Sequence, residues 1–516
     1  MKQLNTIKKV VIVGGGTAGW ITANHLAKKL AMPNGIEIVL VESDNIPTIG
    51  VGEGTVPAMR ESLRYFGIDE GEFIKQADAT FKQSIKFVNW THDPSVRGEH
   101  SYHHLFDYPL LSEFDATPYW LHDGQKIKYA QTVAVQSAIC DAGLAPKKIT
   151  DPQYQGATAY AYHLDAAKFS MILTHNAVQK LGVKHIKDDV LDVSIHVDGS
   201  IAAIHTQLNG RIDADIFIDC TGFSALLLGK HLGIEFIDKS DVLFADHALA
   251  IQVPYLDKEQ AIASHTISTA QSSGWIWDIG LSERRGIGHV YSSSHTSHQQ
   301  AEQDLRAYIG KDFDQLEPRL IKMNVGYREK FWHKNCVAIG LSQGFVEPLE
   351  ATGLLVFDAT ARMLAEQFPT THEMMPHVEK RFNTRIKHTW DRVIDFVKLH
   401  YCISKRRDSP FWIDNCDSSS IPVSLQENLD YWRHQIPNQY DFHNKLSIFN
   451  LDNYLYVLYG MEFETNIQSQ AFQFTDHQGY ERWLKHLNQY QQSLLGQLPK
   501  HRALLDKIKQ YGLQAF

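Results

Sequence analysis

The chain has 516 residues, of which 43% are hydrophobic and 21% charged, and its net charge is −9. This length predicts more than one module with an ample core, and the acidic balance without basic blocks argues against a nucleic-acid partner. No apolar run approaches a membrane span, no signal peptide precedes the first strand, the five cysteines are scattered and the histidines lack HExxH-type spacing, so we expect a cytoplasmic protein without membrane contact, disulfides or a metal site.

The first informative stretch is VVIVGGGTAGW at residues 10–20. Its apolar run, Val10–Val13, predicts a strand buried on both faces of a parallel sheet, and a helix is predicted after it. Between them Gly14, Gly15 and Gly16 form a turn, and Gly19 lies in the helix, which gives the pattern Gly-x-Gly-x-x-Gly. Such a turn brings the backbone close to a pyrophosphate at the positive end of the helix. An ordinary tight turn is the alternative.

A second apolar strand is predicted at residues 36–41, and it ends on Glu42. An acid at this distance from the glycines accepts a hydrogen bond from a ribose hydroxyl. Strand, glycines, helix, strand and acid in this order predict an α/β dinucleotide-binding unit. The glycine-rich residues 49–57 that follow are interpreted either as a mobile strap over the cofactor or as a plain surface loop.

Lys82 lies between two aromatic positions at the start of an alternating, strand-like stretch. A lysine there is either a solvated surface charge or a functional amine. Further along, Tyr102, His104 and Phe106 share one face of a predicted strand. That face is interpreted as the wall of an aromatic substrate pocket or as ordinary core.

Asp165 is a predicted cap for a helix at residues 166–181. Strands are predicted at 183–186, 190–193 and 211–219, the last ending on Asp219-Cys220-Thr221-Gly222. A strand that closes on Thr-Gly is the second place where two-dinucleotide-domain flavoproteins bring backbone to FAD. No motif downstream indicates an NAD(P)H site.

Two indoles, Trp275 and Trp277, share one face of a predicted strand and are interpreted as core or as part of a site. A short strand at 336–340 then leads to a second junction between strand and helix, EPLEATG at residues 347–353. The free N–H groups at the start of that helix would hold an anion.

Helical spacing replaces alternation beyond residue 359, with long amphipathic stretches at 373–405, 424–434 and 478–512. We therefore divide the chain into an α/β module at 1–365, with substrate-side inserts at about 91–150 and 240–320, and a mostly helical module at 366–516 that covers the substrate pocket.

Taken together, these motifs resemble the flavin-dependent tryptophan halogenases along essentially the whole chain. The stretches that carry the resemblance are GGGTAGW, GVGEGTVP, ATFK at Lys82, GWIWDIG, EPLEATG and HYCISKRRDSPFW. The paired tryptophans combined with the lysine and the Glu-x-Thr-Gly junction are more specific than a dinucleotide fingerprint. The resemblance implies a Rossmann-like, two-dinucleotide-domain FAD fold with a helical C-terminal module.

The resemblance also implies an activity. FADH2 from a separate reductase reacts with O2, a halide ion is oxidised to hypohalous acid, and this acid travels inside the protein to a lysine and then to an aromatic carbon. Lys82 matches the catalytic lysine, Glu350 the essential glutamate, and Thr352 with Gly353 the halide site. Other matching positions fall where the family contacts FAD (Gly15, Thr17, Ala18, Val190, Leu341 and Leu354) or lines its substrate pocket (His104 and Phe106).

Some positions depart from the family pattern. Gly280 stands where proline usually ends the tryptophan motif, and Ala351 where serine is common. Tyr454 and Leu455 replace a pocket tryptophan, so indole, another indole derivative or a phenol becomes as plausible a substrate as tryptophan, with chloride or bromide. An FAD-dependent aromatic monooxygenase and a non-catalytic flavin-binding protein are the alternative functions, and a homodimer is a family-level expectation.

Overall fold

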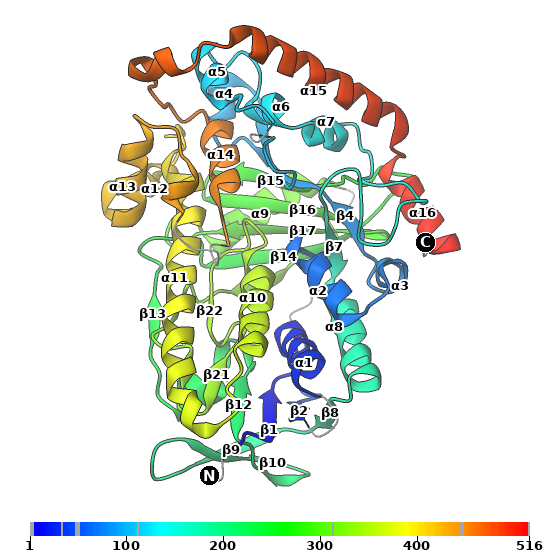
Figure 1. Ribbon diagram of the computed structural model, residues 1–516, viewed down its shortest axis with the longest axis vertical. Helices are drawn as coiled ribbons and strands as arrows, with labels where there is room; N and C mark the ends of the chain where they lie inside the picture. Colours follow the sequence, from blue (N-terminus) through cyan, green and yellow to red (C-terminus); the bar gives the residue numbers. More distant parts are fainter. Residues whose placement is uncertain are drawn as a thin grey trace.

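A computed structural model describes residues 5–31, 35–46, 52–110, 113–311, 314–442 and 448–513. Its first sheet has six strands in the order β20-β21-β12-β1-β2-β8 and lies in the lower half of Figure 1. The strands are β1 (Lys9–Val13), β2 (Glu37–Glu42), β8 (Lys184–Lys187), β12 (Ile216–Asp219), β20 (Trp332–His333) and β21 (Cys336–Ala338). All neighbours pair in parallel except β20 with β21.

Strand β1 is buried on both faces, as its apolar run predicts. Val10 and Ile12 belong to the large core on the side of α1 (Thr17–Leu30). Val11 and Val13 belong to a second core on the opposite face. Helix α1 packs against α8 (Ala166–His175) and α10 (Thr352–Glu366). The Asp165 cap is confirmed, because its carboxylate accepts from the backbone N–H groups of residues 167 and 168.

One predicted strand is divided in the structure. The stretch 211–219 forms β11 (Gly210–Ile212) and then β12 in the main sheet. β11 belongs to a small sheet in which it pairs with β10 (Ile201–Thr206), and β10 pairs on its other side with β9 (Val190–Ile195). The polar residues Asp213 and Asp215 separate the two strands, and the Asp215 carboxylate accepts from the backbone N–H groups of Lys8 and Lys9. Figure 1 shows β9 and β10 below the six-stranded sheet.

The second large sheet crosses the upper middle of Figure 1 and has seven strands in the order β18-β14-β17-β16-β15-β5-β6. They are β5 (Ser84–Val88), β6 (Ser101–Leu105), β14 (His247–Pro254), β15 (Thr266–Gln271), β16 (Gly274–Gly280), β17 (Arg284–Tyr291) and β18 (Arg319–Lys322). A small sheet, β3 (Gly52–Gly54), β7 (Ala161–Asp165) and β4 (Thr80–Lys82), contacts it through β3. A further sheet contains β13 (Phe236–Asp238), β19 (Gly326–Arg328) and β22 (Gly344–Phe345).

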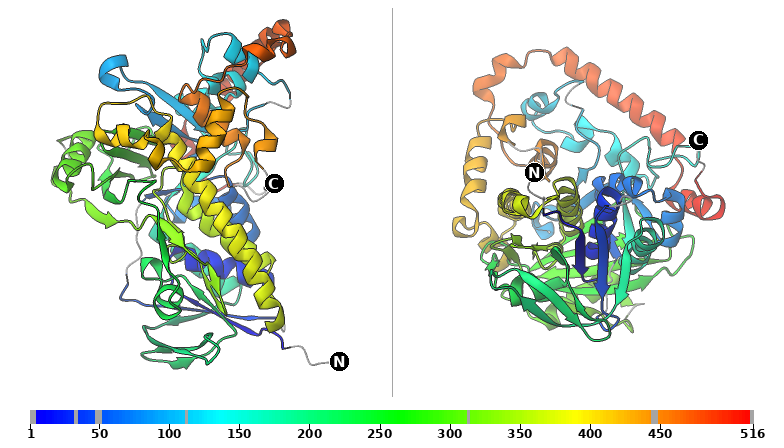
Figure 2. Two further views of the ribbon diagram at one scale, coloured as in Figure 1. Left: turned by 90° about the vertical axis from the view of Figure 1, so that its left-hand side faces the viewer. Right: turned by 60° about the horizontal axis from the view of Figure 1, so that its bottom comes forward.

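The C-terminal part is mostly helical. Its helices are α11 (Met375–Cys402), α12 (Pro410–Asn415), α13 (Val423–Trp432), α14 (Leu451–Gly460), α15 (His477–Gln497) and α16 (His501–Tyr511). The predicted helix 478–512 is two helices, because Pro499 disfavours helical backbone at Leu498, which is extended. Figures 1 and 2 show α15 arching over the end of the molecule that carries α14. The module boundary near 365 stays a prediction.

The remaining α-helices of the described residues are α2 (Ala58–Phe66), α3 (Glu70–Gln76), α4 (Pro94–Arg97), α5 (Thr117–His122), α6 (Tyr129–Val133), α7 (Gln136–Asp141) and α9 (His298–Ile309). Within the described ranges, no helix combines the length and apolar character needed to cross a bilayer.

Candidate active site

The glycine turn after β1 has the geometry that a bound pyrophosphate needs. Gly14 has a φ of 110°, and a Cβ there would lie 2.2 Å from the Cys220 carbonyl oxygen, so only glycine fits. A Cβ on Gly16 would meet nothing within 4 Å, and Gly16 provides no side-chain cap for α1. The first N–H groups of α1 therefore face open space, which suits an anion.

Two other residues of the predicted dinucleotide-binding motif, Gly19 and Glu42, have different contacts. A Cβ on Gly19 would lie 2.0 Å from the Gly14 carbonyl oxygen, so Gly19 lets α1 pack against the turn. Gly19 does not line the cavity described below, and its interpretation as a cofactor contact stays a prediction. The Glu42 carboxylate lies over Gly15, where a Cβ would come within 1.5 Å of Oε2, and its Oε1 is 2.7 Å from His185 Nε2.

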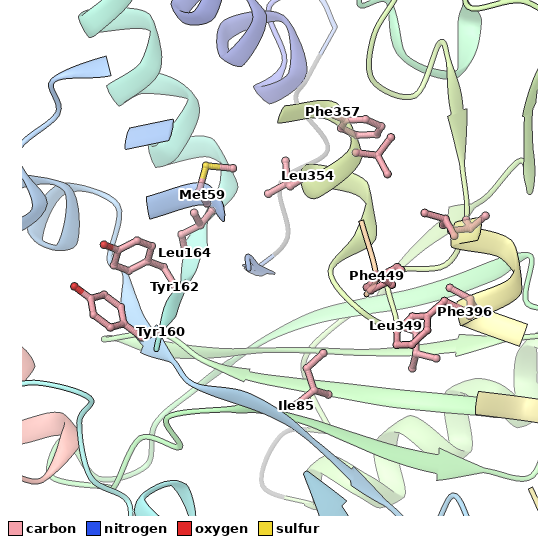
Figure 3. Close-up of a cluster of buried hydrophobic side chains, with 14 of the residues drawn as sticks. Met59, Ile85, Tyr160, Tyr162, Leu164, Leu349, Leu354, Phe357, Phe396 and Phe449 are labelled. Carbon is pink, nitrogen blue, oxygen red and sulfur yellow. The ribbon is translucent and has the colours of Figure 1, made fainter. Parts of the chain in front are cut away.

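One cavity of about 460 Å³ joins this turn to Lys82. The predicted cofactor residues that line it are Gly14, Gly15, Gly16, Thr17, Ala18, Glu42, Val190, Leu341 and Leu354. Lys82, Ile85, Gly353 and both tryptophans of the pair line it as well. Figure 3 shows Leu354 and Phe357 on α10, with Ile85 on β5 across from them. The glycines, the free start of α1 and Glu42 fit FAD, whose ring end would extend toward Lys82.

The predicted strap is described only from Gly52 onward, and residues 49–51 lie outside the described residues. Glu53 lines the cavity, and burial, together with the charge of Asp165, raises its pKa to about 7. A Cβ on Gly54 would lie 3.1 Å from Lys82 Nζ. A larger residue at this position would therefore crowd the amine.

Lys82 is a buried amine, so its interpretation as a solvated surface charge is wrong. It ends β4, which pairs with β7, and its side chain is 1% exposed. Its Nζ lies 5.3 Å from the centroid of the Phe106 ring. Burial lowers the pKa of Lys82 from 10.5 to about 8, although the Glu350 charge opposes this. A sizeable fraction is therefore a neutral nucleophile near pH 8.

Glu350 is held by two histidines from distant elements. The carboxyl is 2% exposed, and both of its oxygens lie 2.9 Å from His104 Nδ1 on β6. His400 Nε2 on α11 lies 2.9 Å from Oε1. Burial alone would raise the pKa of Glu350, but its contacts with His104 and His400 lower it to about 2. His400 was missed in the sequence, where nothing links it to an acid fifty residues earlier.

The predicted halide position lies at the start of α10. Ala351, immediately before the helix, is left-handed with a φ of 55° and does not cap it. Thr352 Oγ1 is buried and has no hydrogen-bond partner among the described residues. An orphaned hydroxyl beside the free N–H groups of a 15-residue helix suits a small anion.

The paired tryptophans form part of the cavity wall. Trp275 Nε1 donates to Glu347 Oε2 at 2.6 Å, and Tyr401 Oη donates to the same oxygen at 2.5 Å. Burial raises the pKa of Glu347 to about 7. The Trp277 ring covers Gly288, where a Cβ would lie 2.1 Å from it.

Tyr454 does not line this cavity, and neither do His104, Phe106 and Glu350, so its assignment to the substrate pocket stays a prediction. Its ring packs on Phe396, Trp432 and Phe442, with centroids 4.9 to 5.4 Å apart. Phe396 in turn stacks on Phe449 at 4.0 Å, and Figure 3 shows both beside Leu349. Tyr454 therefore packs within a cluster of aromatic rings that also contains Phe396, Trp432 and Phe442.

Known proteins match this chain in sequence and in fold over most of its length. The tryptophan halogenase family matches residues 9–477. The chain belongs to the tryptophan halogenase family. A tryptophan halogenase from Shewanella frigidimarina is 45% identical, with a TM-score of 0.95 and 99% of both chains covered. Tar14, a tryptophan C-6 flavin-dependent halogenase (chlorinase) from taromycin biosynthesis, is 33% identical, with a TM-score of 0.91, and the match covers 97% of this chain and 100% of that one.

A relative from Kutzneria, the 7-chloro-L-tryptophan 6-halogenase KtzR, is 34% identical over 97% of this chain and 99% of its own. The halogenase resemblance and the α/β FAD fold with a helical C-terminal part are confirmed. The protein is a flavin-dependent halogenase that uses FADH2 and a halide ion. Enzymes of this family act on aromatic substrates and need a separate flavin reductase.

Proposed function

We propose that this halogenase installs chloride or bromide on an electron-rich aromatic compound of the indole type, with Lys82 and Glu350 at the reacting end. The observation that carries the proposal is the burial of Lys82, with its lowered pKa, in the same cavity as the dinucleotide turn. The relatives named above act on tryptophan or 7-chlorotryptophan, which supports an indole ring as the acceptor.

The residues of the turn and Glu42 would hold the pyrophosphate and ribose of FAD, and Thr352 with Gly353 would hold the halide. With O2 and this halide, reduced flavin would supply hypohalous acid. The cavity, lined at this end by Ile85, leads that acid from the flavin end to Lys82.

At the reacting end, the Lys82 amine takes up the halogen as a haloamine or binds hypohalous acid by a hydrogen bond. If the haloamine forms, the nitrogen displaces hydroxide from the acid and a proton of the amine converts this hydroxide to water. The halogen then passes from nitrogen to a ring carbon, and the ring proton passes to the Glu350 carboxylate and from there to the nitrogen. If the acid is only hydrogen-bonded, the halogen bonds directly to the ring carbon, the hydroxide takes a proton from the Lys82 ammonium and leaves as water, and the ring proton passes to Glu350 and then restores the ammonium. Water exclusion by Phe106 and the neighbouring walls keeps the amine partly neutral.

Trp275 and Trp277 would separate the substrate from the flavin and so favour halogenation over oxygenation. One departure widens the range of substrates: Tyr454 and Leu455 stand where the family pattern has a pocket tryptophan, and the Tyr454 ring packs on Phe396. Free tryptophan, indole and phenols are therefore all included in the test. A homodimer and a cytoplasmic location stay predictions from the sequence.

The test combines the protein with a flavin reductase, FAD, NADH and either bromide or chloride, and offers tryptophan, indole, substituted indoles and phenols. We expect a mass increase of one halogen on at least one indole, as a single ring isomer. Oxygenated product instead would favour a monooxygenase. Hydrogen peroxide release without product across the panel would favour a non-catalytic flavin protein and overturn the proposal.

Lys82→Met tests the named residue, and Lys86→Met is the matched control. Lys86 lies four residues further along, half-buried and paired with Asp141. We expect Lys82→Met to lose halogenated product and Lys86→Met to keep it.

A further inference from the structure

The Glu350 carboxylate belongs to a chain of hydrogen bonds that crosses three elements. It runs from Asn453 on α14 through His104 on β6 to Glu350, and from Glu350 to His400 on α11. His104 and His400 are both buried. Because each ring nitrogen has a defined neighbour, the partners at the two ends fix where the protons lie.

The Asn453 amide fixes the tautomer of His104. Asn453 Oδ1 accepts from the backbone N–H of Asn450 at 2.8 Å, so its orientation is set, since the flipped amide would place donor against donor. The Asn453 Nδ2 group must then donate to His104 Nε2, 3.0 Å away. His104 Nε2 is therefore a bare acceptor, and the single hydrogen is on Nδ1, facing Glu350.

His400 has a different protonation state. Its Nδ1 lies 2.9 Å from the carbonyl oxygen of Phe396, which can only accept, so Nδ1 carries a hydrogen. Its Nε2 lies 2.9 Å from Glu350 Oε1. One proton must lie between these two atoms, and an ionised Glu350 requires that it be on His400, which is then an imidazolium.

We propose that Asn453 and His400 are positioning residues that fix the protonation of the Glu350 site: Asn453 holds His104 as the neutral Nδ1–H tautomer, and His400 supplies the cation that keeps Glu350 a carboxylate. One charged and one neutral histidine leave the group formed by these side chains with no net charge. Glu350 can then accept a proton next to Lys82.

The proposal rests on Glu350 acting in halogenation, but its first test needs no turnover. In protein labelled with [15N]histidine, the signals of His104 are those lost in His104→Gln. We expect a hydrogen-bearing Nδ1 and a bare Nε2. A hydrogen on Nε2 would overturn the tautomer assignment while leaving the halogenase proposal standing.

Asn453→Asp is the matched variant, because its carboxylate still accepts from the Asn450 N–H but cannot donate to His104. His104 should then carry hydrogens on both nitrogens, and kcat should fall about tenfold or more. Unchanged nitrogen signals would overturn the proposal. If this variant does not fold, the wild-type signals alone decide the tautomer.

His400→Gln removes the cation and keeps a neutral donor. Glu350 faces Lys82 from β4, Tyr102 and His104 from β6, and His400 from α11. Without the cation, Glu350 should take up a proton at pH 5 to 6 and show the infrared carbonyl stretch of a carboxylic acid.

That band should be absent from the wild type and from the double variant His400→Gln with Glu350→Gln. Below pH 7, log kcat should also fall more steeply with decreasing pH in His400→Gln than in the wild type. A His400→Gln variant with neither the band nor the steeper fall would show a structural role only and overturn the proposal.

Discussion

The rate of halogenation should depend on pH through the protonation of the buried Lys82 amine. Its pKa of about 8 lies below the ordinary 10.5, a difference of about 3 kcal/mol in the free energy of protonation. At pH 7 about a tenth of the amine is neutral, compared with about one part in 3,000 for an ordinary lysine, so burial provides about 300 times more nucleophile.

If the neutral amine takes up the halogen, kcat should rise about tenfold from pH 6 to pH 7 and level off above pH 8 to 9. Glu350, with a pKa of about 2, should add no second limb in this range. The assay is single-turnover bromination of the preferred indole with pre-reduced flavin, which removes the reductase from the pH profile.

The formation of hypobromous acid, measured by trapping in Lys82→Met, provides the control for pH effects on the flavin step. A fall in kcat above pH 8 would show that the ammonium is the active form, and a profile without a limb near 8 would refute the burial argument.

Three further substitutions test the effect of the buried Lys82 amine on stability, the proposed halide site at Thr352 and the cavity wall at Trp275. Lys82→Met should raise the thermal midpoint at pH 7, because a lysine with a lowered folded-state pKa destabilises the fold most below pH 8. The increase in the midpoint should shrink as the pH rises from 8 to 10.5. A midpoint below that of the wild type at pH 7 would contradict the destabilising role of Lys82. Thr352→Val removes the orphaned hydroxyl at nearly constant volume, so the KM for halide should rise about threefold to thirtyfold, while the FAD Kd, titrated by flavin fluorescence, stays the same. Trp275→Ala opens the cavity wall and should yield oxygenated product by mass spectrometry; unchanged halogenation with no oxygenated product would count against the wall.

Local patterns predicted the cofactor end of the molecule well. The strand at β1, its glycine turn and Glu42 follow from residue types within about thirty positions, and the structure places them around one cavity. The Asp165 cap was equally local. These features depend on backbone geometry that residues close in sequence determine, so they can be predicted from local sequence patterns.

The reacting end depends on packing between distant segments and was predicted only in part. Residue types suggested a choice between surface and site for Lys82, and the resemblance singled it out together with Glu350. The contact of His400 with Glu350 and that of Asn453 with His104 join elements 50 and 349 residues apart. The packing of Tyr454 on Phe396, Trp432 and Phe442 could not be predicted, because an aromatic-rich helix does not reveal which of its faces meets which neighbour.

The most direct test of the account is the bromination of one indole by wild type, Lys82→Met and Lys86→Met under identical conditions, with ring isomers separated by chromatography and identified by mass spectrometry. The account predicts one brominated isomer from wild type and from Lys86→Met. Lys82→Met should yield none above the isomer mixture that free hypobromous acid gives. The same single isomer from Lys82→Met at the wild-type rate would contradict it.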